Sequence, residues 1–78
     1  MVSIAVQSIM DNDFKKIVYH IEHGGHVDEP DSTNTTLLMR AYIYKRKNTI
    51  DYLIKHGADV NAVDNYGNTV EIYKKNNS

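Results

Sequence analysis

The sequence repeats itself with an offset of 33 residues. The segment His-Gly-Gly-His-Val-Asp at 23–28 recurs as His-Gly-Ala-Asp-Val-Asn at 56–61, so Gly24 and Gly57 lie 57 − 24 = 33 positions apart. The same offset joins further identical residues: Ile17 with Ile50, Tyr19 with Tyr52, Ile21 with Ile54, Asp31 with Asp64, and Thr36 with Thr69. A fixed period of this size predicts a helical repeat array. Such arrays usually bind other proteins and carry out no chemistry, so the period restricts function as well as fold.

The composition allows one small domain, residues 1–78, and excludes several classes of protein. A chain of this length buries a smaller fraction of its surface than a typical domain does, so we expect marginal stability. The absence of cysteine excludes disulfides and favours a cytoplasmic, intracellular setting. The apolar residues 1–10 lack a basic leader and are too short to span a bilayer, so we expect a helix there and no membrane association.

The period divides the chain into three units, a first at 1–27, a second at 28–60 and a partial third at 61–78. The first unit lacks a leading turn, and the third ends before a second helix. A single helix pair cannot bury both of its faces, so neighbouring units must stack to form a continuous core. We therefore expect one all-α domain built from stacked helix pairs.

Each full unit is predicted to contain two helices joined by a short loop. The earlier helices are expected at 3–10 and 37–44, because the first segment is apolar on much of its circumference and Thr36 is placed to cap the second. The later helices carry apolar stripes at helical spacing, with Phe14, Ile17, Val18 and Ile21 in the first unit and Ile50, Leu53 and Ile54 in the second.

Polar residues and glycines predict where these helices begin and end. Asp13 is placed to cap the later helix of the first unit. Gly24 and Gly57 follow the last turns of the two later helices, where glycine adopts a left-handed backbone without steric cost. The segments 31–34 and 64–67 have the composition of tight turns, with Asn or Gly where a positive backbone angle is needed.

At these residues the sequence resembles the ankyrin-repeat family. The segment 36–41, Thr-Leu-Leu-Met-Arg-Ala, stands where that family usually has Thr-Pro-Leu-His-x-Ala. The segment 57–62, Gly-Ala-Asp-Val-Asn-Ala, matches the family ending, and 64–69, Asp-Asn-Tyr-Gly-Asn-Thr, matches the hairpin that begins the next unit. The resemblance implies an ankyrin-like stack of helix-turn-helix repeats (an α-solenoid) that acts as a protein-protein interaction module.

The departures from the family pattern carry expectations of their own. Leu37 replaces the usual proline and Met39 the usual histidine, so we expect apolar packing in place of the usual threonine-to-histidine hydrogen bonding. Glu71 and Lys74 occupy places where the family buries Leu and Ala. We interpret the third unit as a polar terminal cap for this reason.

The resemblance places the binding surface on the turn tips and on the exposed side of the earlier helices. By this resemblance the partner-binding residues are Met10, Asp11, Ser32, Thr33, Thr35, Ile43, Tyr44, Asn65, Tyr66 and Asn68. Tyr44 and Tyr66 are the preferred anchors, because tyrosine offers a large apolar area together with a hydroxyl group. The alternative for Tyr44 is that it only packs between adjacent turns.

Other clusters of functional residues favour simpler explanations. The run Lys45-Arg46-Lys47 is suited to phosphate or an acidic partner, but it also suits a solvated loop, and three charges are few for nucleic-acid binding. His20, His23 and His26 invite a metal reading, yet His23 and His56 hold equivalent places beside helix-ending glycines, where imidazole interacts with the last carbonyls. We expect no metal, no cofactor and no enzymatic activity.

We therefore predict a small interaction module that binds a larger protein as an inhibitor or adaptor. Because fewer than three full units are present, we also expect a homodimer through an uncovered apolar face around Ile4, Ala5 and Ile9. Abundant Ile, Lys, Asn and Tyr suit an AT-rich coding sequence, which is common in phages, large viruses and some bacteria. If the chain is a phage or viral protein, we expect its target to be a host defence or regulatory protein. The alternative is a nucleic-acid accessory protein that uses residues 45–47.

Overall fold

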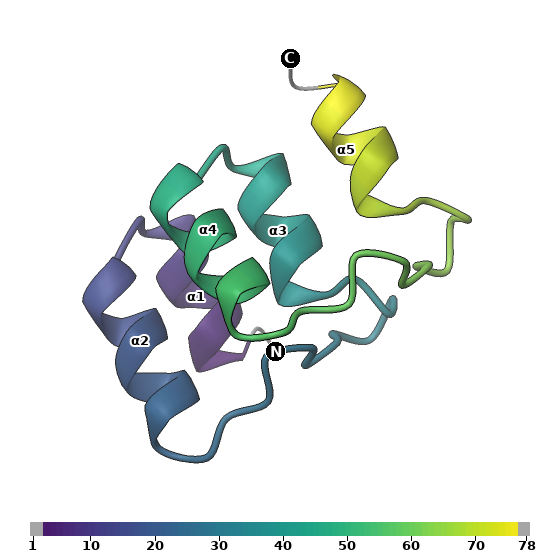
Figure 1. Ribbon diagram of the computed structural model, residues 1–78. Helices are drawn as coiled ribbons and strands as arrows, with labels where there is room; N and C mark the ends of the chain where they lie inside the picture. The colour runs from purple at the N-terminus through teal and green to yellow at the C-terminus, as the bar shows by residue number, and fades with distance from the viewer. Residues whose placement is uncertain (1–2, 77–78) are drawn as a thin grey trace.

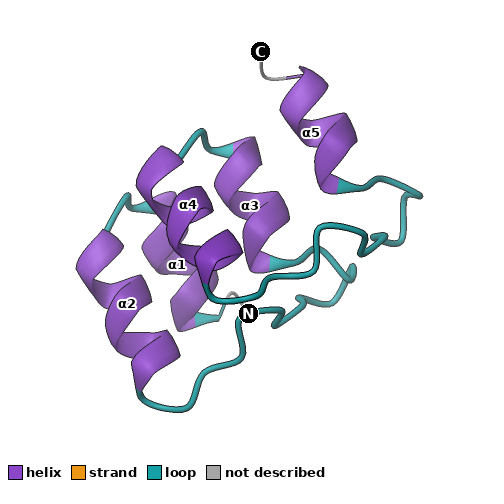
Figure 2. Ribbon diagram, viewed as in Figure 1, coloured by secondary structure: helices purple, strands orange, loops and turns teal. Residues whose placement is uncertain are grey.

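The computed structural model describes residues 3–76, and within them the chain forms helices joined by turns and no strand (Figures 1 and 2). One isolated bridge pairs Pro30 with Thr36. The five helices are α1 (Ile4–Met10), α2 (Phe14–Glu22), α3 (Leu37–Ile43), α4 (Lys47–Lys55) and α5 (Val70–Asn76). The prediction of an all-α fold is confirmed.

The helices stack in the order that the repeat predicts. α1 contacts α2, α3 contacts α4, and the two pairs lie side by side through contacts of α1 with α3 and of α2 with α4. α5 continues the row of earlier helices by packing against α3, as Figure 1 shows. The unit boundaries at 27/28 and 60/61 stay a prediction.

Polar side chains cap the starts of α1 and α2, and glycines follow the ends of α2 and α4. Ser3 accepts a hydrogen bond from the Val6 amide, and Asp13 accepts one from the Lys16 amide at 3.2 Å, so both side chains satisfy amides of a first turn. Gly24 and Gly57 follow α2 and α4 with φ values of 97° and 88°. The expected caps and glycine stops are confirmed.

At the start of α3, Met39 makes hydrogen bonds with Thr36 in addition to the apolar packing that the sequence predicts. The Met39 amide donates to Thr36 Oγ1 at 3.2 Å, and the Thr36 amide donates to Met39 Sδ at 3.4 Å. The thioether is a weak acceptor, but it reaches the amide that the capping residue leaves free. Met39 therefore completes a reciprocal cap as well as filling the core.

The core lies between the two rows of helices and along the face that α1, α3 and α5 share. Its buried apolar residues are Ala5, Val6, Ile9, Ile17, Leu37, Leu38, Met39, Ala41, Leu53 and Val70. Ala5 and Ile9 are 0% and 1% exposed, because they lie one helical turn apart on the inward side of α1. The prediction of an uncovered self-association face at these two residues is wrong, and only Ile4 of that set is exposed.

Hairpins connect the units and stack on each other. Asn34 and Gly67 have φ values of 59° and 79°, as the turn composition predicts. The Asn65 amide donates to the Thr33 carbonyl at 2.9 Å, and Asn34 Nδ2 donates to Asn65 Oδ1 at 2.9 Å. These two bonds hold the second and third hairpins in register.

Candidate functional site

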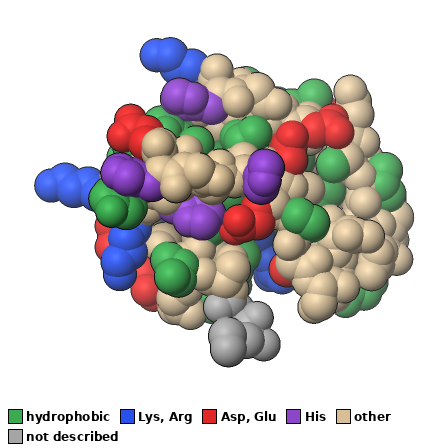
Figure 3. Space-filling view, turned by 90° about the horizontal axis from the view of Figure 1, so that it is seen from below, with side chains coloured by type: hydrophobic (Ala, Val, Ile, Leu, Met, Phe, Trp, Pro, Cys, Tyr) green, Lys and Arg blue, Asp and Glu red, His purple; other side chains and the backbone are tan. Residues whose placement is uncertain are grey.

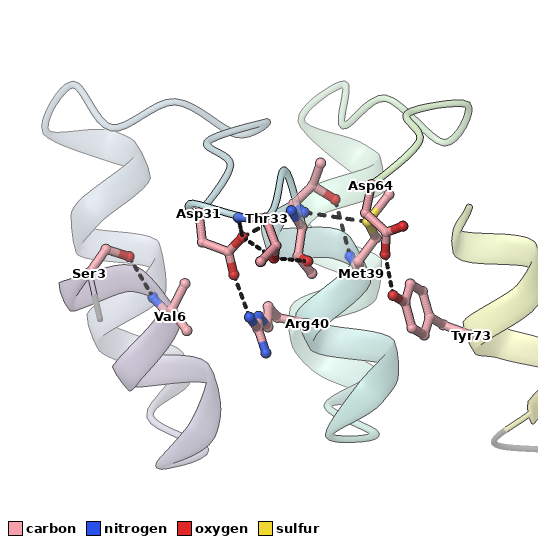
Figure 4. A network of polar contacts seen from close by, with 10 residues as sticks. Ser3, Val6, Asp31, Thr33, Met39, Arg40, Asp64 and Tyr73 are labelled. Carbon is pink, nitrogen blue, oxygen red and sulfur yellow. Dashed lines mark hydrogen bonds and ion pairs between the residues drawn. The ribbon is translucent and has the colours of Figure 1, made fainter. Parts of the chain in front are cut away.

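A hollow of about 290 Å³ lies between α1, α3 and the second hairpin. We call it the α1–α3 groove. Figure 4 shows Asp31 of the hairpin facing Arg40 of α3, with Ser3 and Val6 on the α1 side. The groove is lined by Ser3, Val6, Met10, Asp31, Ser32, Arg40 and Tyr44. Apolar side chains thus form one wall, and a charged pair lies on the other.

Asp31 is fixed by a set of local hydrogen bonds. Its Oδ1 accepts from the amides of Thr33 and Thr35 at 2.8 and 3.0 Å, and from Thr33 Oγ1 at 2.7 Å. Its Oδ2 accepts from the Arg40 guanidinium. Burial raises the pKa of Asp31, but the bonds from Arg40 and Thr33 outweigh it and hold this pKa well below its usual range. Asp31 is therefore ionised at neutral pH.

Arg40 is the counterion of Asp31 in the lining of the groove. Its hydrogen bond to Asp31 is the main cause that raises the Arg40 pKa further. Its Nε is buried and has no hydrogen-bond partner among residues 3–76. The side chains of Arg40 and Asp31 are 27% and 21% exposed, so the pair is shielded but reachable. The groove thus contains a fixed, neutralised ion pair.

Tyr44 ends α3 beside a second arginine. The Arg46 guanidinium carbon lies 5.9 Å from the centroid of the Tyr44 ring. Arg46 Nε donates to the Ile9 carbonyl at 2.9 Å, and its Nη2 donates to the Met10 carbonyl at 2.8 Å. Arg46 therefore caps the C-terminal end of α1 from the next unit, which fixes the end of the groove at Met10.

The third hairpin repeats the carboxylate of the second. Asp64 Oδ1 accepts from the amides of Tyr66 and Asn68, both at 2.9 Å, and Asp64 Oδ2 accepts from the Tyr73 hydroxyl. Burial raises the pKa of Asp64, but the bonds from Tyr73 and the two amides outweigh it, so the pKa is lowered. Burial, together with Asp64, raises the pKa of Tyr73. Tyr66 projects from this hairpin with 71% of its surface exposed.

A comparison of the sequence with models of protein families gives a match that agrees with this arrangement of hairpins and helix pairs. A family model described as "Ankyrin repeats (many copies)" matches residues 37–73, from the start of α3 into α5. This match supports an ankyrin-repeat family for residues 37–73. A search of curated proteins found no match. Ankyrin repeats are typically protein-protein interaction modules without enzymatic activity.

The predicted binding residues of this ankyrin stack fall into two groups. Met10, Ser32 and Tyr44 come together in the groove. Asn65, Tyr66 and Asn68 belong to the third hairpin, where Asn65 also bonds Asn34. Asp11 is exposed at the end of α1 and Ile43 is half-buried on α3. The assignment of these residues to partner contacts stays a prediction.

Two predicted contact residues serve the hairpin itself. Thr35 is 3% exposed, because its hydroxyl contacts Thr33 Oγ1 at 2.8 Å and its amide bonds Asp31. Its placement on the exposed face was wrong. Thr33 is half-buried and bonds Asp31 through both amide and hydroxyl. Both threonines therefore shape the turn.

Sequence reasoning missed four residues of the groove, namely Ser3, Val6, Asp31 and Arg40. One signal was available for two of them. Arg40 follows Asp31 by nine residues, and Tyr73 follows Asp64 by the same nine, so the period aligns the two helix partners. Residues in equivalent positions of a repeat tend to serve the same contact.

The histidines gather with acidic residues on the face where α2 and α4 end (Figure 3). His20 Nε2 lies 3.2 Å from Glu29 Oε2, and His23 Nδ1 donates to the Tyr19 carbonyl at 2.8 Å. The His23 ring stacks on Tyr19 at a centroid distance of 3.8 Å, and the His56 ring lies tilted against Tyr52 at 4.2 Å. Residues 3–76 contain no group of three or more possible metal ligands. The contacts of His23 agree with its expected place beside the last carbonyls of α2.

No helix within residues 3–76 has the length and apolar character needed to cross a membrane.

Proposed function

We propose that this ankyrin-repeat chain binds a larger protein through the α1–α3 groove and the tip of the third hairpin. The observation that carries the proposal is the convergence of Met10, Ser32 and Tyr44, from three separate elements, on one groove. Side chains brought together from several elements form one continuous surface, so a single partner can contact all of them.

The chemistry of the groove suits a partner segment that is partly apolar. Met10 and Val6 offer an adaptable apolar wall, and Tyr44 adds an aromatic surface. The pair of Asp31 and Arg40 supplies polar groups of both signs beside that wall. A partner that buries an apolar side chain here and hydrogen-bonds to the ion pair would leave no polar group unsatisfied.

Tyr66 extends the proposed surface beyond the groove. It is 71% exposed, and its backbone amide is held by Asp64 at 2.9 Å, so the side chain leaves from a fixed turn. An exposed tyrosine on a rigid support loses little conformational freedom when it binds. We assign Tyr66 to a peripheral contact and Tyr44 to the central one.

We propose further that binding makes the chain an inhibitor or adaptor, because a module of this size acts by occupying a surface of a larger protein. The composition supports a phage or viral protein with a host factor as its target. This finer assignment rests on composition and size.

The alternative role in nucleic-acid binding has less support. It rests on residues 45–47, but the Arg46 donors Nε and Nη2 bond to the carbonyls of Ile9 and Met10. Only Lys45 and Lys47 of the run are exposed. Two lysines supply few of the phosphate contacts that such binding needs.

The experiment compares proteins captured from a lysate by the immobilised chain and by three tyrosine variants. We expect Tyr44→Ala to lose the partner, Tyr66→Ala to retain less of it, and Tyr19→Ala to retain it fully. Tyr19 is the matched control, because it is 63% exposed on α2, outside the groove. Urea unfolding of each variant checks that the fold survives. Equal capture by native chain and Tyr44→Ala would contradict the proposal.

A further inference from the structure

The stack of helix pairs is open at the end formed by α4 and α5. α2 pairs with α1 and α4 pairs with α3, but among residues 3–76 no later helix pairs with α5 in the same way (Figure 1). The 33-residue period allows each residue at this end to be compared with its equivalent one unit earlier. This comparison shows which residues at the open end lack the cover that their equivalents have.

Apolar residues that are covered in the earlier units are uncovered here. Ile21 and Val27 pack against the core, whereas their equivalents Ile54 and Val60 are each 44% exposed. On the earlier helices the same change occurs between Met39, which is fully buried, and Ile72, which is 38% exposed. The period gives the cause, because the following unit covers the first set and nothing described covers the second.

The uncovered surface also carries charges of both signs. Glu71 and Lys74 take the positions of Leu38 and Ala41, which are buried in the second unit. Both charged residues are exposed. They lie three residues apart and therefore close together on one side of α5. Beside them, Ile72 provides an apolar centre.

We propose that this open end, defined by Ile54, Val60, Glu71, Ile72 and Lys74, binds a second copy of the chain about a two-fold axis. The two α5 helices run antiparallel across the interface. Glu71 of each copy then faces Lys74 of the other, and the apolar residues become buried between the copies. The proposal goes beyond the function proposed above and involves none of the groove residues.

Charge complementarity selects a second copy over other occupants. When the two-fold axis passes midway between Glu71 and Lys74, the acidic position of one antiparallel α5 lies against the basic position of the other, and this contact occurs twice. Head-to-tail stacking, by contrast, would leave the place of a second helix beside α5 unfilled. Two-fold pairing is also closed, so it ends with the dimer.

The surface is small, and the dimer is accordingly weak. Stable interfaces bury about 800 Å² on each partner, and the whole described chain exposes 5051 Å². An interface limited to one helix and the adjacent edge lies below that size. We expect half of the chains to be paired at a concentration on the order of 100 µM.

Sedimentation equilibrium of the native chain and of two charge-reversal variants tests the proposal. Native protein should change from monomer to dimer between about 10 µM and 1 mM. Glu71→Lys alone and Lys74→Glu alone should each stay monomeric over this range, because each places like charges opposite one another. An equimolar mixture of the two variants should form the dimer again, since the lysines of one copy then meet the glutamates of the other.

The mixture separates pairing from folding. Each reversal also opposes the α5 helix dipole, so both variants lose some helix stability, and mixing cannot restore it. Lys15→Glu is the matched control, because Lys15 is exposed on α2, away from α5, and this variant should dimerise like the native chain. Tyr44→Ala should also dimerise, which distinguishes this proposal from the groove. A native chain that is monomeric at 1 mM, or a mixture that stays monomeric, would overturn it.

Discussion

Asp31 in the second hairpin and Asp64 in the third occupy equivalent positions and hold their turns in the same way. Each Oδ1 accepts from the amides two and four residues later, at 2.8 to 3.0 Å. Each Oδ2 accepts from a side chain nine residues later, on the helix that follows. That side chain is Arg40 in one case and Tyr73 in the other.

The difference separates what the fold requires from what each unit can vary. A carboxylate at the start of the hairpin satisfies two backbone amides, so both units keep it. The helix partner has only to donate a hydrogen bond, and it can therefore be a cation or a phenol. Arg40 leaves a half-buried ion pair at the groove, while Tyr73 leaves Asp64 only 5% exposed beside the terminal helix. The second hairpin thus has polar groups available to a partner. In the third hairpin the carboxylate is buried and serves to hold the turn.

The largest loss of stability is expected from substitution of the buried carboxylate, Asp64. Asp64→Ala should lower the free energy of unfolding by about 3 kcal/mol, because two amides and the Tyr73 hydroxyl lose their acceptor in a buried place. Asp31→Ala should cost about 1 kcal/mol, since water can reach its partners. Urea unfolding measures both, with an osmolyte added if a variant is too unstable. Equal losses of unfolding free energy in the two variants would contradict the claim that burial makes Asp64 more important for stability than Asp31.

Acid should weaken both hairpins. The pKa values of Asp31 and Asp64 are lowered in the folded chain relative to an unfolded value of about 3.9. Their ionised forms therefore stabilise the fold above about pH 4, and this contribution is lost as the pH falls through the folded pKa values. We expect the urea midpoint to fall less below pH 4 in an Asp31→Asn, Asp64→Asn double variant than in native protein. Asp51→Asn, at an exposed site, should behave like the native chain.

A smaller effect is expected from removal of one hydroxyl. Tyr73→Phe keeps the ring but leaves Asp64 Oδ2 without this donor, so it should cost about 1 to 2 kcal/mol. It should also raise the pKa of Asp64, because the hydroxyl is the main group that lowers it. Carbon-detected NMR titration of the carboxyl group follows this change. An unchanged pKa would mean that the two amides alone hold the carboxylate.

The smallest effect on stability is expected at the exposed tip of the third hairpin. Tyr66→Ala should change the free energy of unfolding by less than about 0.5 kcal/mol, because the side chain is 71% exposed and the Asp64 bond uses the backbone amide. Urea unfolding beside the native chain checks this. A loss above 1 kcal/mol would show that the ring supports the hairpin and is not free for a partner.

The features that follow from short segments were predictable from the sequence. The caps at Asp13 and Thr36 and the glycine stops at Gly24 and Gly57 each depend on neighbouring residues along the chain, and the 33-residue period can be found by comparing the sequence with itself. Their physical rules need no knowledge of the packing. The all-α stack follows from them.

Features that depend on contacts between units were less accessible. The burial of Ala5 and Ile9 depends on how α1 turns toward its neighbours, which an apolar run on all sides of a helix does not reveal. Arg46 looked like part of a solvated basic loop, yet it bonds carbonyls 36 and 37 residues earlier. Thr35 looked like a turn-tip residue, but its polar groups close the turn. In each case a partner distant in the fold decides the role.

The account depends most on the claim that the α1–α3 groove receives a protein partner. The most direct measurement is an amide NMR titration of the isotopically labelled chain with the protein that it captures. We predict shifts at Met10, Ser32 and Tyr44, weaker shifts near Tyr66, and none along α2. Shifts confined to α2 and α4, with an unperturbed groove, would contradict the account.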